Sequence, residues 1–242
     1  MLRIRIQLPK RQQQSYRYYD ILHDALINAW IAAGADAKQV IGAFALPWNF
    51  AALGKHQGKQ ATVHTLIVST PDPDLSTYLA KFTVNSIRYI RATTEEFIDF
   101  SAASIAIEHD PILPAQQNLG VFLLSPLAIQ KRGQKQRLWH QKLQQVDLSA
   151  AINHRLSRLS QRTVNLKVYP DSLYLRANPK HSVLVKTKRM RSGKEAFVLA
   201  MQAPLLLIGS EVDLRLAWYT GLGEKNRNGF GCIGLIEQGV GR

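Results

Sequence analysis

The sequence predicts an α+β fold of two tandem ferredoxin-like domains, with a glycine-rich loop near the C-terminus and an added basic helical segment. Three observations support this fold class. Both halves of the 242-residue chain alternate strand-like and helix-like patterns in a similar order. Hydrophobic residues make up 46% of the chain, which is enough for packed cores. Pro111 and Pro114 suit a linker, so we expect domains at 1–112 and 119–242, the second with a basic helical insertion at about 131–163.

The N-terminal half opens with a strand pattern of period two. Residues 2–8 place apolar side chains on one face and Arg3, Arg5 and Gln7 on the other, so this strand is expected to be half-buried. A helix with an apolar stripe follows and stops at Gly34, a favourable C-terminal residue. The other elements expected before the linker are a strand at 61–70, a short helix begun by Asp74, and strands near 84–90 and 104–107.

The second half opens with a strand at 119–129. The basic segment after it contains a helix whose apolar stripe is formed by Leu148, Ile152, Leu156 and Leu159. Strands or hairpin arms are expected at 166–169, 173–175, 183–188 and 196–206. Ser210 with Asp213 forms a capping-box pattern that begins the last helix, and residues 230–237 form the last strand.

The charge of the chain points to a polyanionic partner. The formal net charge is +14, and residues 131–194 carry sixteen Lys or Arg against two acids, a difference equal to the surplus of the whole chain. A surplus of this size is not needed for folding, because it raises self-repulsion. A nucleic acid or an acidic membrane is the kind of partner it favours, and its concentration in one segment favours a nucleic acid.

Other features of the sequence exclude several classes of protein. The chain has no signal-peptide pattern and no apolar run near the length of a membrane span, so we expect a soluble cytoplasmic protein without a membrane partner. Cys232 is the single cysteine, which excludes an internal disulfide and a cysteine-based zinc cluster. We expect its thiol to be buried and inert.

Two elements concentrate the positive charge. Arg155, Arg158 and Arg162 recur at helical spacing on a face different from the apolar stripe, where a row of guanidinium groups can follow a phosphate backbone. The second element is a hairpin that turns at Ser192 and Gly193. Its basic residues are Lys186, Lys188, Arg189, Arg191 and Lys194.

The segment GLGEKNRNGFGCIGL, from Gly221 to Leu235, contains five glycines. Glycines allow positive φ and close approach of backbone amides to an anion. The spacing lacks the GK[ST] of a phosphate-binding NTPase loop, and its place after a helix near the C-terminus does not fit a dinucleotide-binding fold. The alternative interpretation is a loop that only closes a sheet.

This segment resembles the C-terminal glycine-rich loop of the CRISPR repeat-RNA endoribonucleases of the RAMP superfamily. The preceding helix, the basic hairpin and the strand containing SPLAI resemble that family too. The resemblance implies tandem ferredoxin-like (RRM-like) domains and metal-independent cleavage of precursor CRISPR RNA without a cofactor. The implied partners are the repeat stem-loop, the mature crRNA and subunits of a CRISPR effector complex.

From the charge pattern and the resemblance we expect a set of RNA-binding residues in the second half. They are Arg137, Arg155, Arg158, Arg162, Lys186, Lys188, Arg189, Arg191, Lys194, Gly221, Gly223, Lys225, Arg227, Gly229 and Gly231. Trp139 is a further candidate for stacking on a base, with a core contact as the alternative.

Metal-free RNA cleavage requires attack of a ribose 2′-OH on the adjacent phosphate, with proton transfer and charge stabilisation. His23 lies in YDILHDAL, which resembles a Tyr-x-x-Leu-His-x-x-Leu stretch on the helix that carries the catalytic histidine in some branches of the family. The alternative is a polar residue at a helix edge, paired with Asp20 or Asp24. Lys38 is a candidate for phosphate charge stabilisation and Tyr19 for orienting a ribose; the alternatives are a solvated lysine and core packing. No metal site is expected.

Two further alternatives stay open on the sequence. In the type IV branch of the family, arginine or lysine is thought to replace histidine in catalysis. The chain could also be a non-catalytic guide-RNA-binding scaffold of a CRISPR effector complex, since fold alone does not decide activity. A general RNA chaperone is a third hypothesis, which predicts similar affinity for unrelated hairpins.

Overall fold

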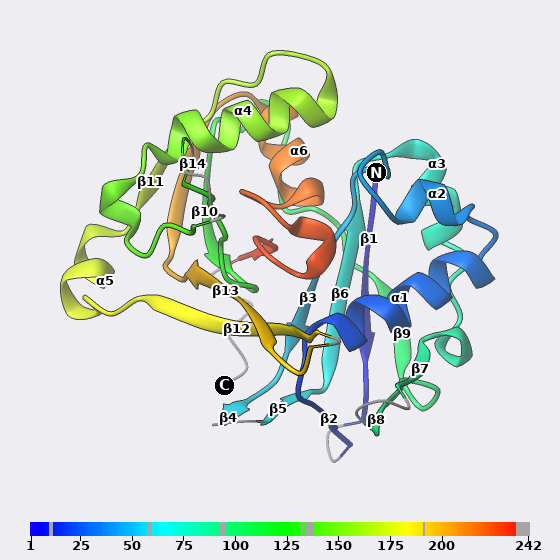
Figure 1. The fold of residues 1–242 in the computed structure, drawn as a ribbon. Coiled ribbons are helices and arrows are strands. Elements are labelled where there is room, and N and C mark those ends of the chain that lie inside the picture. Colours follow the sequence, from blue (N-terminus) through cyan, green and yellow to red (C-terminus); the bar gives the residue numbers. More distant parts are fainter. Residues whose placement is uncertain are drawn as a thin grey trace.

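The computed structural model of the protein describes residues 1–9, 12–57, 60–91, 95–131, 133, 138–190 and 192–235. It contains two four-stranded sheets, one from each half of the chain, with helices packed against them (Figure 1). The first half contains β1 (Leu2–Gln7), β2 (Gln14–Tyr16), α1 (Asp20–Ala32), α2 (Ala37–Val40), β3 (Asn49–Leu53), β4 (His56–Gln57), β5 (Gln60–Val63), β6 (Thr65–Thr70), α3 (Pro73–Leu79), η1 (Val84–Ser86), β7 (Arg88–Arg91), β8 (Glu96–Asp99) and β9 (Ser104–Ile107).

The second half follows a similar alternation of strands and helices. It contains β10 (Asn118–Leu123), η2 (Leu143–Gln145), α4 (Leu148–Ser160), β11 (Lys167–Pro170), α5 (Ser172–Ala177), β12 (Ser182–Arg189), β13 (Glu195–Met201), β14 (Leu205–Ile208), α6 (Glu211–Thr220), η3 (Asn226–Asn228) and β15 (Ile233–Gly234). The α+β prediction is therefore confirmed. Among the described residues, no helix combines the length and apolar character needed to cross a bilayer.

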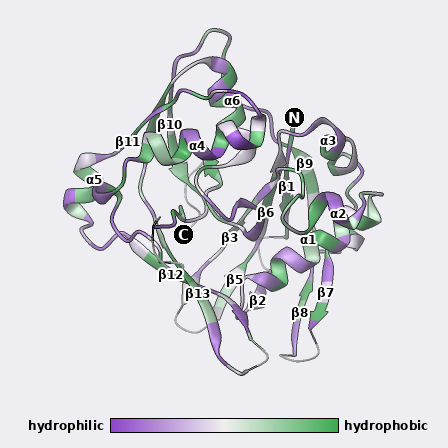
Figure 2. Cartoon of the chain, turned by 45° about the horizontal axis from the view of Figure 1, so that its top comes forward, coloured by the Kyte–Doolittle hydropathy of each residue, from purple (hydrophilic) through white to green (hydrophobic). Residues whose placement is uncertain are grey.

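The first sheet has the antiparallel order β3-β6-β1-β9, and α1 packs on one of its faces. Ile4 and Ile6 of β1 share a core with Leu22, Leu26 and Trp30 of α1, and each of these side chains is at most 2% exposed. The stripe predicted for this helix is what creates that core. Figure 2 shows hydrophobic and hydrophilic residues along both α1 and α4, as expected for helices that bury one face.

The prediction of a half-buried first strand holds at Gln7, which is exposed, but it fails at Arg3, which the second half of the chain covers. Arg3 is 0% exposed. Its Nη1 donates to the carbonyl of Ile233 at 2.7 Å, its guanidinium lies 4.2 Å from the centre of the Trp218 ring, and its Nη2 is 3.2 Å from Glu108. The charged side chain of Arg3, which suggested a solvent-facing side of β1, is instead buried between the two halves of the chain and contacts residues of both.

The second sheet has the order β11-β14-β10-β15 and shares a core with α4 and α6. Val121 and Leu207 of the sheet, Ile152 and Leu156 of α4 and Leu214 of α6 are 0% exposed. The hydroxyl of Ser210 accepts from the amide of Asp213, which confirms the predicted cap of α6.

Several predicted elements differ in the structure. The run 61–70 is split at His64 into β5 and β6, which belong to different sheets. The cap of α3 is Asp72, whose carboxylate accepts from the amide of Leu75, and not Asp74. Residues 173–175 are helical because Asp171 caps α5.

Candidate active site and nucleic-acid interface

The glycine-rich loop folds back on itself after α6. The amide of Leu222 donates to Gly231 at 2.7 Å, and the buried side-chain amide of Asn226 donates to Leu222 at 3.0 Å. Gly229 and Gly231 have φ of 80° and 73°. A Cβ on Gly229 would lie 2.2 Å from the Tyr19 ring, and one on Gly231 would lie 1.8 Å from the Leu222 oxygen. These positions therefore require glycine both for the backbone conformation and for space.

The same packing changes the role expected of the glycine amides. The amides of Gly221, Gly229 and Gly231 donate to the carbonyls of Ala217, Asn226 and Pro126. These three amides already have internal acceptors, so they do not supply the close anion contacts that a glycine-rich backbone allows. Gly223 also has positive φ, 68°, and lies against Ala128. The loop is thus a compact support that carries the charged side chains of Lys225 and Arg227.

Tyr19 joins the loop to the start of α1. It occupies the N-cap position, is 5% exposed, and stacks on Phe50 with ring centres 5.7 Å apart. Burial raises the pKa of its phenol above the ordinary range. This environment is the one that the core-packing alternative for Tyr19 requires.

The basic hairpin β12–β13 is fastened to the same end of α1. The amide of Tyr19 donates to the carbonyl of Lys186 at 3.0 Å, and the hydroxyl of Tyr18 donates to Glu195 at 2.8 Å. Lys186 is not free at the tip, since its Nζ is 2.8 Å from Glu195. The residues Lys188, Arg189 and Lys194 are exposed beyond this anchor, and Arg191 lies outside the described residues.

His23 lies on the first turns of α1. Its Nδ1 is 3.1 Å from Oδ1 of Asp24, and its ring stacks on Trp48 with centres 5.8 Å apart. Arg91 of β7 donates to both Asp20 and Asp24 at 2.6 Å. The pairing of His23 with Asp24 was one of the two interpretations of this residue. The His23 side chain keeps 18% of its surface exposed, so it also remains accessible to a ligand.

The two carboxylates beside His23 have different electrostatic environments. Burial raises the pKa of Asp24, but the hydrogen bonds and charges of His23 and Arg91 outweigh burial, so it lies below its ordinary value. Burial raises the pKa of Asp20 above its ordinary value, although Arg91 acts in the opposite direction. Asp24 is therefore the better anionic partner for a histidine.

Lys38 lies in α2, beyond the C-terminal end of α1. It is exposed, and its backbone amide donates to Asp36 at 2.8 Å. The connection from α2 to His23 runs through Trp48, whose indole donates to the carbonyl of Val40 at 3.2 Å. Trp48 thus connects His23 to α2, the helix that carries Lys38.

The basic face of α4 meets the glycine-rich loop. Burial lowers the pKa of Arg155, and the neighbouring charges of Arg158 and Arg227 lower it further. Burial also lowers the pKa of Arg227. Nε of Arg155 and Nη1 of Arg227 are buried without a hydrogen-bond partner among the described residues. Lys225 of the glycine-rich loop lies 5.6 Å from the ring centre of Trp139, which pairs with Gln130 before α4.

The row of three arginines predicted on one helix is reduced to two. The helix α4 ends at Ser160, and Gln161 turns the chain with φ of 54°. Arg162 follows this turn and pairs with the buried Asp213 at 2.5 Å. Arg158 is exposed on the helix, and Arg137 lies outside the described residues.

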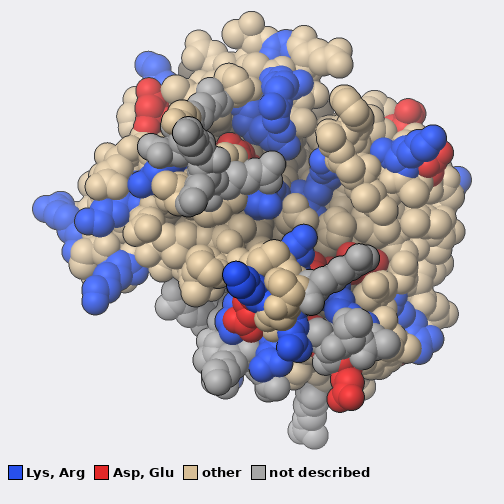
Figure 3. All heavy atoms as spheres, in the orientation of Figure 1, with Lys and Arg blue, Asp and Glu red and all other residues tan. Residues whose placement is uncertain are grey.

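Positive side chains gather on the face that carries these elements. Figure 3 shows Lys and Arg over α4 and, lower on the same face, over the end of the β12–β13 hairpin. The glycine-rich loop lies between these two regions (Figure 1). The start of α1, the loop, the hairpin and α4 thus converge on one face, although they are far apart in the sequence.

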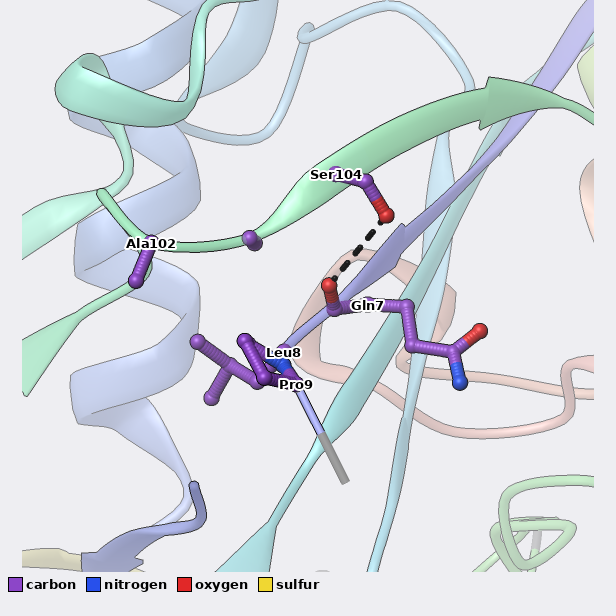
Figure 4. A pocket seen from close by; sticks show the side chains of 6 residues that line it. Gln7, Leu8, Pro9, Ala102 and Ser104 are labelled. Atoms are coloured by element: carbon purple, nitrogen blue, oxygen red, sulfur yellow. Dashed lines mark hydrogen bonds between the residues drawn. The ribbon is translucent and has the colours of Figure 1, made fainter. Parts of the chain in front are cut away.

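A separate hollow of about 300 Å³ lies at the end of β1 (Figure 4). It contains no titratable side chain and none of the predicted site residues, and its lining is Gln7, Leu8, Pro9, Ala102, Ala103 and Ser104. We therefore assign no role to it.

Sequence reasoning missed Arg91 and Trp48, which hold the surroundings of His23. The only local signal was Asp20 and Asp24 at a spacing of four, which places two carboxylates on one helix face and calls for a cation. Nothing in the sequence indicated that this cation would come from β7.

Comparison with known proteins identifies the second half most directly. The family described as “CRISPR associated protein Cas6, C-terminal” matches residues 109–235. No curated protein sequence matches the chain.

Solved structures match the whole chain in fold. A Cas6-related protein from Pyrococcus furiosus is similar at 14% identity, with 98% of this chain and 99% of that chain covered and a TM-score of 0.70. A RAMP protein described as binding different RNA substrates shares 13% identity over 98% and 100% of the two chains, with a TM-score of 0.63. Cas6 from Thermus thermophilus shares 11% identity over 96% of each chain, with a TM-score of 0.54. At these identities the likeness concerns the fold, and the tandem ferredoxin-like arrangement is confirmed.

Proposed function

The chain belongs to the family of CRISPR associated protein Cas6, C-terminal, and from this premise we propose that it binds the repeat stem-loop of a precursor CRISPR RNA and cleaves it without a metal ion. The cleavage is an attack of the ribose 2′-OH on the adjacent phosphate, leaving a 2′,3′-cyclic phosphate and a 5′-OH. The observation that carries the proposal is the convergence of His23, the Arg155–Arg227 pair and the basic hairpin around one glycine-rich loop.

RNA binding is supported first by Arg155 and Arg227. Burial lowers the pKa of both guanidinium groups, and the charge of Arg227 lowers that of Arg155 further. Each also has a buried nitrogen without a hydrogen-bond partner among the described residues, an arrangement that is unfavourable without an anion. A phosphate between them would supply acceptors to both. Arg158, Lys188, Arg189, Lys194 and Lys225 extend the same positive face, and Gly221, Gly223, Gly229 and Gly231 hold the loop in shape. The structural relative described as binding different RNA substrates supports this part of the proposal.

Cleavage is assigned to His23. An imidazole whose Nδ1 is engaged by Asp24 has Nε2 left to exchange a proton with the 2′-OH or the 5′ oxygen. Lys38 is proposed to offset charge on the phosphorane, and Tyr19 to hold the loop against α1.

The remaining parts of the function follow the family. We propose that residues 1–112 and 119–242 act as two domains that share the RNA, and that the product crRNA stays bound and enters an effector complex in the cytoplasm. The competing hypothesis is a scaffold that binds guide RNA without cutting it. Its specific support is that Tyr19 is buried in the core, where it cannot orient a ribose.

The test is incubation with the repeat RNA of the CRISPR array nearest the gene, in EDTA. Wild-type protein is expected to cut the repeat once and leave a cyclic phosphate. His23→Ala should slow cleavage by roughly 10²- to 10⁴-fold with binding unchanged. His109→Ala, at an exposed histidine between β9 and β10, is the matched control and should cut normally.

The other outcomes each favour a rival. Tight binding with an intact repeat after long incubation supports the scaffold. Cleavage that needs a divalent metal removes the proposed mechanism. Equal affinity for unrelated hairpins supports a general RNA chaperone.

A further inference from the structure

We infer that Asp24 and Arg91 are positioning residues that fix the tautomer and orientation of His23, with Nε2 as the atom that exchanges the proton. This inference rests on the proposed function for its catalytic meaning. The observation behind it is the continuous series of contacts from Arg91 through Asp24 to His23.

Arg91 lies between two carboxylates of one helix face. Asp20 and Asp24 are four residues apart on α1, so their charges would repel across one turn. Nη1 and Nη2 of Arg91 each donate to one of them at 2.6 Å. The Arg91 side chain is 14% exposed. A planar guanidinium held at two points fixes the orientation of both acceptors better than an ammonium could.

The strand that supplies Arg91 is itself braced against α1. The side-chain amide of Asn28, about one turn beyond Asp24 on α1, donates to the carbonyl of Arg88 at 2.8 Å. On the partner strand, the carboxylate of Glu96 accepts from the amides of Arg17 and Tyr18, just before α1 begins. The β7–β8 pair thus contacts both ends of the helix segment that bears His23, so Arg91 reaches Asp24 from a fixed strand.

The carboxylate of Asp24 decides which ring nitrogen carries the proton. An ionised carboxylate can only accept a hydrogen bond, so Nδ1 of His23 must be the donor at 3.1 Å. In the neutral ring the lone pair then lies on Nε2. Stacking on Trp48, with an interplanar angle of 18°, limits rotation of the ring. The charged groups around His23 are therefore Asp24 beside it, Arg91 and Asp20 one contact further, and Glu96 next to Asp20.

The direct test is the ¹⁵N NMR signature of the histidines in the free protein. Wild type should show His23, assigned by its loss in His23→Ala, as the Nδ1–H tautomer. Asp24→Asn and Arg91→Met should lose or mix this tautomer. Arg88→Met is the matched control, since Arg88 lies on the same strand with an exposed side chain that pairs with Asp99 and not with α1, and it should leave the signal unchanged.

The kinetic test uses the same variants with repeat RNA in EDTA. Asp24→Asn and Arg91→Met should lower the single-turnover rate by about 10-fold or more, with the Kd for a repeat lacking the attacking 2′-OH unchanged. Unfolding midpoints of all variants are measured alongside. If Arg91→Met folds poorly, Asp24→Asn alone provides the test, because asparagine has nearly the same shape as aspartate.

The outcomes separate this inference from the proposed function. Wild-type cleavage that depends on His23, with Asp24→Asn and Arg91→Met equal to Arg88→Met in both rate and tautomer, overturns the inference alone. Absence of wild-type cleavage overturns the proposed function and the catalytic meaning of the pair, and the NMR signature still decides whether Asp24 and Arg91 fix the ring.

Discussion

Arg155 and Arg227 illustrate at the scale of single residues how the site was assembled. Arg155 was predicted from a helical spacing and Arg227 from a glycine-rich loop, with no indication that the two would lie together. Only the folded structure shows that the two arginines are neighbours, and burial there lowers the pKa of both. A sequence can indicate a positive charge, but not which other charge it will face.

The first prediction concerns this pair. Arg155→Met and Arg227→Met should each weaken repeat-RNA binding by about 10- to 150-fold, because each removes charged hydrogen bonds to phosphate worth roughly 1.5–3 kcal/mol. Each should also make the dependence of log K on log salt shallower by about one. Binding is measured at several salt concentrations, with Lys81→Met at an exposed residue after α3 as the control. An unchanged salt dependence would exclude a phosphate between the two arginines.

The second prediction concerns Cys232, which is predicted and found to be buried. Burial raises the pKa of its thiol from 9.0 to about 11. A raised pKa favours the protonated thiol of the folded state. This stabilisation is complete below pH 9 and is lost as the pH rises toward 11.

Between pH 8 and pH 10 wild type should therefore lose about 1 kcal/mol more unfolding free energy than Cys232→Ala. Urea titrations of both proteins at the two pH values measure this. The comparison cancels the titration of lysines and tyrosines that both proteins share. Parallel losses in the two proteins would contradict the assigned pKa.

At the scale of elements, prediction succeeded where the signal is local. The caps at Ser210 and Gly34, the turn at Gly193 and the stripe of α4 each depend on a few neighbouring residues. It failed for β3, whose residues NFAAL are buried on both faces in its first four positions and so show no alternation. It failed again for residues 173–175, where one capping side chain, Asp171, decides between helix and strand.

The third prediction tests the glycine-rich loop as a packed element. Gly229 and Gly193 both have φ of 80°, but a Cβ on Gly229 would meet Tyr19 at 2.2 Å, whereas one on Gly193 would meet nothing within 4 Å. Both alanine variants should lose about 1–2 kcal/mol for the left-handed backbone. Gly229→Ala should lose more unfolding free energy than Gly193→Ala, because the rings of Tyr19 and Phe50 must also move to admit the Cβ.

Denaturant unfolding of the two variants measures this difference directly. The shared φ makes Gly193→Ala a control for backbone strain, and the excess loss in Gly229→Ala reports the contact between the loop and α1. Equal losses would mean that the loop is not pressed against Tyr19 and Phe50 as the structure has it.

At the scale of the whole molecule, the two halves are joined by buried polar contacts that no local pattern predicts. Arg3 of the first strand reaches the carbonyl of Ile233 in the last one. The connection between the halves is fastened as well, since Arg215 of α6 pairs with Asp110 and donates to the carbonyl of Ile112. These long-range contacts are what place α1 beside the glycine-rich loop, so the site depends on both halves.

The sequence therefore predicts many residues of the candidate site, but it does not predict how they are arranged in space. The basic helix, the hairpin and His23 could be selected from spacing and resemblance. Their convergence, the burial of Tyr19 and the contribution of Arg91 depend on packing between segments up to about 200 residues apart, and single-sequence patterns carry no such information.

The central claim is that repeat RNA crosses the glycine-rich loop between His23 and the Arg155–Arg227 pair. A structure of the protein with a repeat lacking the attacking 2′-OH tests it most directly. The account predicts the scissile phosphate within hydrogen-bond reach of Nε2 of His23, and a neighbouring phosphate between the two arginines. Nucleotides bound far from both α1 and the glycine-rich loop would contradict it.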